Sequence, residues 1–289
     1  MPTNYVISTA DIRSGYTLNL AAGDSLVVTT GAGIYWSANS AITYEPAVEG
    51  SNPSKYVIMG SVVIDTFAVG GSSEFRVGIQ GSVLVGNGLG LGNGGSSCNL
   101  TNDGIISATN VYFWAIFCDG SYNSIVNNGT ISGSYGVYLG SFGNVLYNAG
   151  LISAQIYGVT MDGTSASAYN SGEIVGSFGI YIAGENNDLP SSMSVTNTGT
   201  INSENYGIYA GLDLASSALT IKNSGTISGK YHSLLLYDSP DTVTNTGTLN
   251  GDVSLGGGAD IFDSRSGTVN GIVNGGLGAD TYFTNDHNL

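Results

Sequence analysis

Carboxylates dominate the side chains of this chain that could do chemistry. The sequence holds 21 Asp and Glu residues against 6 Lys and Arg residues, which gives a formal net charge of −15 over 289 residues. Such a surface repels nucleic acid and anionic lipid, because binding to either requires basic side chains that displace counterions. The composition suits a soluble secreted protein or one that collects divalent cations. We expect no nucleic-acid partner and no membrane insertion.

Basic groups that could carry acid–base chemistry are few. A lyase or epimerase acting on a uronate needs Lys, Arg, His or Tyr side chains that neutralise the carboxylate and move its proton. Only Lys222, Lys230 and His232 are close enough in sequence to cluster, and they surround an ordinary Asn-Ser-Gly segment. We therefore expect these three side chains to lie on a solvated edge.

Paired carboxylates and glycine loops give no stronger catalytic signal. Asp238 and Asp241 are neighbours, but Pro240 between them indicates a corner loop rather than the defined carboxylate separation of a glycosidase. The segment 86–95, GNGLGLGNGG, precedes no helix, so we predict a flexible corner or an insertion rather than a phosphate site. We predict that the protein is not an enzyme. A polysaccharide lyase, epimerase or glycosidase, or a carbohydrate-binding module, is the alternative.

The elements that must position all of these side chains are repeats. A unit of the form apolar-x-Asn-x-Gly-x-apolar recurs at intervals of 21–27 residues, and an aromatic-Gly-apolar segment such as Tyr135-Gly136-Val137 follows it in several copies. Short runs of aromatic and β-branched residues between Gly, Ser and Asn predict strands, and this period is typical of a β-solenoid. We predict an all-β parallel β-helix of about ten coils, with 184–190 as a loop insertion. The repeated asparagines are Asn102, Asn127, Asn148, Asn170, Asn197, Asn223 and Asn245.

The strand period of two predicts where the repeated asparagines point. It places Ile125, Asn127, Gly129 and Ile131 on one face, and the apolar pair requires that face to be the core. Each asparagine then lies inside a corner, where its amide can bond the backbone and the same amide in the coils above and below. The glycine is expected to permit the bend that follows.

Aromatic residues form two further columns in the repeat frame. An outward column could stack on sugar rings or on a partner, or could reflect only the β-propensity of Tyr. The aromatic residues three positions earlier in each repeat are expected to face the core. A partial column of threonines leaves an ice-binding solenoid as a further alternative. The outward column is Phe117, Tyr138, Thr160, Tyr181 and Tyr209; the expected inward set is Trp114, Tyr135, Tyr157, Phe178, Tyr206 and Tyr231; the threonines are Thr130, Thr200, Thr226, Thr248 and Thr268.

The two cysteines, Cys98 and Cys118, lie about one coil apart. In the repeat frame Cys118 matches Leu139, an inward position, and Cys98 matches Asn123 just before the next strand. A disulfide between neighbouring coils and two buried free thiols are both open at this point, because two cysteines do not define a disulfide scaffold.

The recurring NTGTI and NSGTI segments followed by YGIY resemble the passenger β-helices of bacterial autotransporters and related large surface adhesins. The resemblance covers roughly residues 50 to 255. It implies a surface-exposed solenoid, but it does not select an activity, because such helices carry adhesins, proteases and lyases alike.

A second resemblance lies near the C-terminus. Segments 255–263, LGGGADIFD, and 275–283, GGLGADTYF, are similar to the calcium-binding nonapeptide GGxGxDxUx of RTX proteins, although only two copies occur and they are not in tandem. The resemblance implies calcium as the cofactor, with hard oxygen ligands. It also implies type I secretion, which fits an N-terminal segment without a cleavable signal pattern. The residues assigned to the metal are Gly256, Gly258, Asp260, Gly276, Gly278 and Asp280.

The 20-residue interval between Asp260 and Asp280 equals one coil and predicts that the two carboxylates lie on the same edge. We predict a β-rich cap over 1–50, solenoid repeats over 51–250 and calcium-binding coils over 251–289. The expected protein is an extracellular adhesin, surface-layer or matrix-filament subunit. It joins itself head to tail, because the final strands carry unpaired backbone groups. Surface polysaccharide is a second expected partner, and coverage of the end by a further domain is the alternative to self-association.

Overall fold

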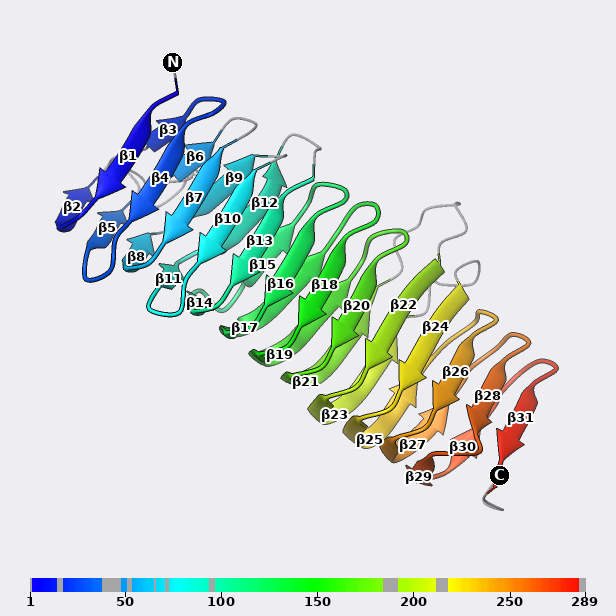
Figure 1. The fold of residues 1–289 in the computed structure, drawn as a ribbon. Helices are drawn as coiled ribbons and strands as arrows, with labels where there is room; N and C mark the ends of the chain where they lie inside the picture. The colour runs from blue at the N-terminus through cyan, green and yellow to red at the C-terminus, as the bar shows by residue number, and fades with distance from the viewer. Residues whose placement is uncertain are drawn as a thin grey trace. The chain divides into compact units, whose positions relative to one another are not determined.

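The computed structural model describes residues 2–14, 18–37, 48–50, 54–64, 66–70, 73–93, 97–183, 192–211 and 218–285. Every element in these residues is a β-strand, and the strands pair in parallel as a β-solenoid of about 11 turns, which confirms the predicted fold class (Figure 1). The chain divides into two compact units, residues 1–146 and 147–289. The described residues include no helix long and apolar enough to cross a membrane.

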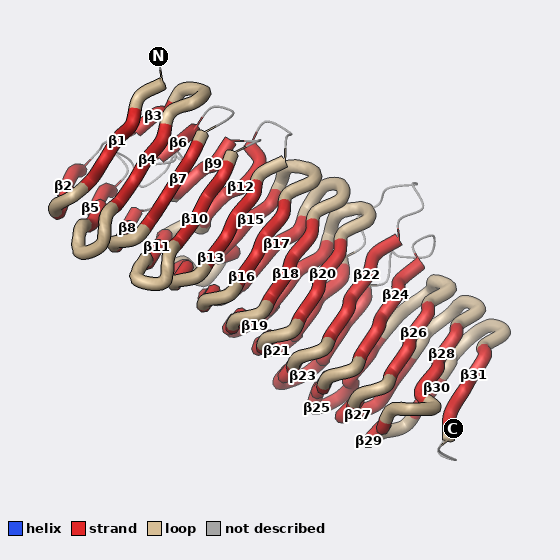
Figure 2. Tube along the Cα trace, in the orientation of Figure 1, coloured by secondary structure: helices blue, strands red, loops and turns tan. Residues whose placement is uncertain are grey.

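In the first unit most coils contribute three short strands, one to a first sheet and two to a second (Figure 2). The first-sheet strands are β1 (Asn4–Ile7), β4 (Ser25–Val28), β7 (Lys55–Ile58), β10 (Glu74–Val77), β13 (Asn99–Asn102) and β16 (Ser124–Asn127). The second-sheet strands are β2 (Ala10–Ser14), β3 (Leu18–Leu20), β5 (Gly33–Ser37), β6 (Val48–Gly50), β8 (Ser61–Ile64), β9 (Phe67–Gly70), β11 (Ser82–Val85), β12 (Leu89–Asn93), β14 (Ile105–Ala108), β15 (Trp114–Cys118) and β17 (Thr130–Leu139).

In the second unit the two strands of the second sheet merge into one long, bent strand in most coils. Strand β18 (Val145–Asn148) spans the boundary between the two units. The remaining first-sheet strands are β20 (Ser167–Asn170), β22 (Ser192–Asn197), β24 (Ala218–Asn223), β26 (Thr242–Asn245), β28 (Ile261–Ser264) and β31 (Thr281–Thr284). The second-sheet strands are β19 (Leu151–Met161), β21 (Glu173–Ile182), β23 (Thr200–Ala210), β25 (Thr226–Leu235), β27 (Thr248–Ser254), β29 (Thr268–Asn270) and β30 (Val273–Asn274).

Strict alternation within the short strands builds the core. In β7 the side chains of Tyr56 and Ile58 are fully buried while Lys55 points outward. In the first unit, the rings of Tyr56, Phe67 and Phe75 from neighbouring coils pack with centroid distances of 5.0–5.5 Å. Because strand register is kept from coil to coil, one inward apolar residue per strand position is enough to give a continuous core.

The predicted asparagine ladder is confirmed. The repeated asparagines are 0–2% exposed. In the second unit, Asn197 Nδ2 donates to Asn223 Oδ1 at 2.8 Å and to the Thr226 carbonyl at 3.1 Å, while Asn197 Oδ1 accepts from Asn170 Nδ2 at 2.7 Å. Each of these asparagines in the second unit from Asn148 to Asn245 therefore bonds a corner carbonyl of the next coil, and buried amides are stable there because each has partners.

The glycine of the repeat has a different role from the predicted one. At Gly225 the backbone does not adopt positive φ, so its conformation is open to other residues. A Cβ there would instead overlap the carbonyl of Gly199 in the preceding coil, and Gly247 meets Gly225 in the same way. The turn needs glycine because successive backbones stack too closely for a side chain.

The predicted cap over 1–50 and the insertion over 184–190 are only partly visible. Residues 184–190 lie outside the described residues. The described part of 1–50 forms β1 to β6. Strand β4 pairs in parallel with β7, with Ser25 opposite Lys55. This N-terminal stretch thus has the same parallel pairing as the coils that follow it in the first unit.

Candidate functional site

Three aspartates stack on one corner of the second unit. Asp241, Asp260 and Asp280 each precede a first-sheet strand, and the strand register places them in successive coils. The backbone N–H of Asp241 donates to Asp260 Oδ1 at 2.8 Å, and that of Asp260 donates to Asp280 Oδ1 at 3.2 Å. The arrangement agrees with the expectation that Asp260 and Asp280 share an edge.

The second oxygens of two of these carboxylates are not satisfied. Oδ2 of Asp241 and Oδ2 of Asp260 are buried and have no hydrogen-bond partner among the described residues. Burial, together with the nearby Asp260, raises the pKa of Asp241 to about 7, against hydrogen bonds from Ser239 and the Leu219 N–H that favour the charged form. Burial, together with the nearby Asp280, raises the pKa of Asp260 to about 6. A proton or a cation is the physical means of neutralising such oxygens.

The two glycine loops that lead into Asp260 and Asp280 are conformational copies. Gly256 and Gly276 have φ of 93° and 90°, and Gly258 and Gly278 have φ of 136° and 134°, all in the region that favours glycine. The loops stack directly, since the Leu277 N–H donates to the Gly256 carbonyl at 2.8 Å. These four glycines are therefore required for close stacking as well as for any role toward a metal.

The fit of these residues to calcium rests on the orphaned Oδ2 atoms. Calcium takes six to eight oxygen ligands from carboxylates, carbonyls and water. Among the residues that the structure describes, no group of three or more His, Cys, Asp or Glu side chains is arranged to hold a metal ion. Asp260 and Asp280 are the carboxylates that would hold the ion, and calcium would supply positive charge to the orphaned oxygen of Asp260.

Asp241 is the member of this stack that the sequence analysis missed. It was assigned to a corner loop with Asp238, but only Asp238 is exposed, while Asp241 is 2% exposed. The signal that could have found it is positional, because Asp241, Asp260 and Asp280 each stand directly before a four-residue strand at intervals of 19 and 20 residues. Its segment lacks the glycines that marked the other two.

The outward aromatic column exists, but its geometry differs from a sugar-stacking platform. In the second unit Tyr181 stacks on Tyr157 with a centroid distance of 4.7 Å and on Tyr209 with 5.6 Å, at interplanar angles of 15° and 24°. Both faces of Tyr181 are thus covered by neighbouring rings. In the first unit Phe117 stacks on Tyr138 at 4.7 Å. At the Thr160 position of the column the side chain is 3% exposed.

The prediction that the earlier aromatics face the core is wrong. Phe178 and its equivalents are partly exposed and stack beside the outward column, and Tyr231 is 50% exposed. The reason is a break in alternation, because Gly179 and Ile180 both point inward where β21 bends and its register with the next coil shifts. A side chain at Gly179 would collide with Ile201, so only glycine fits there. The partly exposed equivalents are Trp114, Tyr135, Tyr157 and Tyr206.

The remaining candidates are not assembled into a site. Lys222 lies in β24 of the first sheet, whereas Lys230 and His232 lie in β25 of the second sheet. Cys98 and Cys118 are buried free thiols, and burial raises the pKa of Cys98 to about 12. In the second unit Thr200, Thr226, Thr248 and Thr268 are in register, but the column does not continue before Thr200, because Glu173 and then Leu151 occupy that position in the two preceding coils.

The glycine-rich segment 86–95 begins with a bend over residues 86–88, where the sequence predicts a corner, and continues as β12. In β12 Leu89 and Leu91 are buried in the core, and Gly90 lies between them on the outer face. The strand pairs in parallel with β9 on one side and with β15 on the other. The alternation of leucine and glycine therefore gives an ordinary core-forming strand, in which Gly90 leaves no side chain on the outer face.

Comparisons of this chain with protein-family models, curated proteins and solved structures gave no match.

Proposed function

We propose that this chain is an extracellular structural protein, a cell-surface adhesin, surface-layer or matrix-filament subunit, whose coils self-associate end to end and are stabilised by calcium. The observation that carries the proposal is the apolar surface of the last coil. Ile272, Leu277 and Phe283 on its outer surface are 66%, 79% and 41% exposed. Its inward residues Val269, Val273 and Tyr282 are only half-buried, whereas their register partners in the coil before, Leu249, Val253 and Phe262, are at most 1% exposed. Exposed apolar surface of this kind requires a cover.

The backbone of the last coil is also open. Among the described residues β31 pairs only with β28, which makes it an edge strand of the first sheet. At the first coil, β1 likewise pairs only with β4 among the strands that the structure describes. Such edges template further strand pairing, and a head-to-tail contact between copies does not close on itself, so it propagates as a filament.

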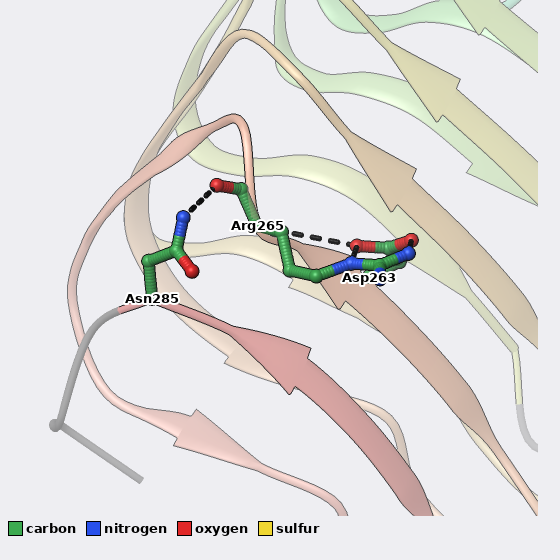
Figure 3. Close-up of polar contacts among 3 residues, drawn as sticks. All are labelled: Asp263, Arg265 and Asn285. Atoms are coloured by element: carbon green, nitrogen blue, oxygen red, sulfur yellow. Dashed lines mark hydrogen bonds and ion pairs between the residues drawn. The ribbon is translucent and has the colours of Figure 1, made fainter.

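Asp263, Arg265 and Asn285 make polar contacts with one another at the corner beside β31 (Figure 3). Arg265 Nη2 lies 2.7 Å from Asp263 Oδ2, and its guanidinium stands over the Phe283 ring with its carbon 4.8 Å from the centroid. Asn285 Nδ2 donates to the Arg265 carbonyl. The hydrogen bonds from Arg265 lower the pKa of Asp263. Arg265 thus packs on the Phe283 ring, which remains 41% exposed.

The aspartate stack and the glycine loops before it are the reason for proposing calcium binding and secretion. The similarity of 255–263 and 275–283 to secreted calcium-binding repeats and the orphaned Oδ2 of Asp260 both favour an ion at this corner. The alternative function, a polysaccharide-active enzyme, has weaker support, because Lys222 is on a different sheet from Lys230 and His232.

Light scattering at high protein concentration tests the association. We expect particles larger than a monomer in millimolar calcium and smaller ones in chelator. Ile272→Lys should reduce association, because a charge at the joint must lose water. Ile79→Lys is the matched control, since Ile79 is 82% exposed in a turn of the first unit. A wild-type protein that stays monomeric in calcium would contradict the proposal and favour a further segment as the cover.

A further inference from the structure

The aromatic column of the first unit stops abruptly and leaves a slot. The strand register sets Phe117 opposite Tyr138 on one side and opposite Gly90 on the other, and Gly90 is in turn opposite Ala68. The ring of Phe117 stacks on Tyr138 at 4.7 Å, and the register-matched positions on its other side are only glycine and alanine. One aromatic face is therefore open where the column would continue.

A cavity of about 390 Å³ fills this gap. Its volume lies within the range of small-molecule sites. Phe117 and Trp114 form one wall, Gly90 and Ala68 form the floor, and Asn87 and Tyr112 contribute an amide and a phenol at the rim. Asn87 Oδ1 accepts from Asn110 Nδ2 at 2.8 Å, which fixes the amide in place.

We propose that this slot binds one pyranose ring of a neutral glycan. The open face of Phe117 suits the C–H face of a sugar, and the fixed amide and the phenol suit its hydroxyl groups. None of the described lining side chains is charged, and the chain carries a net charge of −15, which disfavours uronates and other anionic glycans.

The slot does not suit an extended peptide, which would need a free strand edge to add to the sheet. Strand β12 is paired on both of its edges, with β9 and with β15. The stacked column of the second unit does not offer an equivalent site either, because neighbouring rings cover both faces of Tyr181. The glycine at position 90 is therefore the feature that makes the site.

Gly90 also provides a direct test. A Cβ at this position has only the Phe67 carbonyl within 4 Å, at 3.7 Å, so a side chain fits without strain. Gly90→Phe should extend the stack onto Phe117 and fill the slot while keeping the melting temperature. Phe117→Ala removes the platform, and Tyr169→Ala, which deletes a 40%-exposed ring in the second unit, is the control.

Binding is measured by tryptophan fluorescence in a Trp36→Phe background, because Trp36 and Trp114 are the only tryptophans. The probes are maltohexaose, cellohexaose, xylohexaose and laminarihexaose, with an oligogalacturonate and a tyrosine-containing tripeptide as comparisons. We expect at least one neutral oligosaccharide to shift the emission, and Gly90→Phe and Phe117→Ala to weaken its binding about tenfold or more, which corresponds to about 1.4 kcal/mol. Tyr169→Ala should bind normally.

The inference deepens the adhesive part of the proposed function and rests on it. Titrations are therefore run on the monomer in chelator, so that a failure of self-association does not affect them. The proposal is overturned if no neutral oligosaccharide shifts the Trp114 emission, if Gly90→Phe binds as tightly as the parent, or if only the tripeptide or the oligogalacturonate binds.

Discussion

Individual buried polar side chains carry the specificity of this fold. Asn197 joins three coils of the second unit through its amide, and its burial is complete. The residues directly before the first-sheet strands also bond between coils, with other residue types. Asn123 Oδ1 accepts a hydrogen bond from the Cys98 N–H at 2.9 Å, and Asp260 Oδ1 accepts one from the Asp241 N–H at 2.8 Å. A side-chain oxygen that accepts the backbone of the previous coil is thus the common requirement, and a negative charge is not.

Replacement of Asn197 by leucine tests the ladder at this scale. The change removes the oxygen that accepts from Asn170 Nδ2 and the donor to Asn223 Oδ1 and to the Thr226 carbonyl, so we expect a loss of about 1–3 kcal/mol in the free energy of unfolding. Chemical denaturation measures it. Asn202→Leu, at an exposed position of β23, is the control and should change stability by less than about 0.5 kcal/mol. Equal stability of the two variants would contradict the ladder.

At the scale of the elements, glycine has three different roles. In the asparagine turns it is required, because backbones stack in contact. In β12 the outward Gly90 meets no such restriction and instead leaves space on the sheet surface. The bend within β21 adds a third use, since Gly179 lies inside the corner against Ile201. Glycine content alone does not distinguish these roles.

A pair of alanine substitutions separates the required glycines from the permissive ones. Gly225→Ala forces a Cβ into the carbonyl of Gly199, and we expect it to destabilise the fold by about 3 kcal/mol through displacement of the stacked turns. Gly90→Ala should be neutral or stabilising by about 0.4–1 kcal/mol, because it only reduces the freedom of the unfolded chain. Thermal unfolding of both variants measures this difference, and equal melting temperatures would show that the turns adjust.

At the scale of the whole molecule, we propose that the corner of stacked aspartates links stability to calcium and to pH. We expect calcium to raise the free energy of unfolding by about 2.7 kcal/mol when its free concentration is about 100 times Kd. Asp260→Asn and Asp280→Asn keep an oxygen that can accept the stacked N–H but lose the charge, so they should remove most of the calcium effect. Glu204→Gln, an exposed position in the same unit, should retain it. Calorimetric scans without any calcium shift would exclude the site.

The same scans at several pH values distinguish protons from calcium. Because the folded-state pKa values of Asp241 and Asp260 are raised to about 7 and about 6, the folded chain holds protons that the unfolded chain has released. Their stabilising contribution is complete below the unfolded pKa, near 4, and is lost as the pH rises through about 6 to 7. Without calcium, the melting temperature should therefore fall over this range, and calcium should reduce the fall. A rise with pH would contradict the assignment.

Residue periodicity alone determined the all-β solenoid, the inward asparagine ladder and the shared edge of Asp260 and Asp280, because stacking turns a fixed interval into a position in space. The tertiary structure alone decided three other features. The bend at Gly179 turned Phe178 outward, Asp241 joined the aspartate stack without a glycine signal, and the leucine–glycine segment became β12 with an open slot. Each of these features depends on which residue the neighbouring coil places at the matching register position. The spacing of residues within one repeat does not specify that residue.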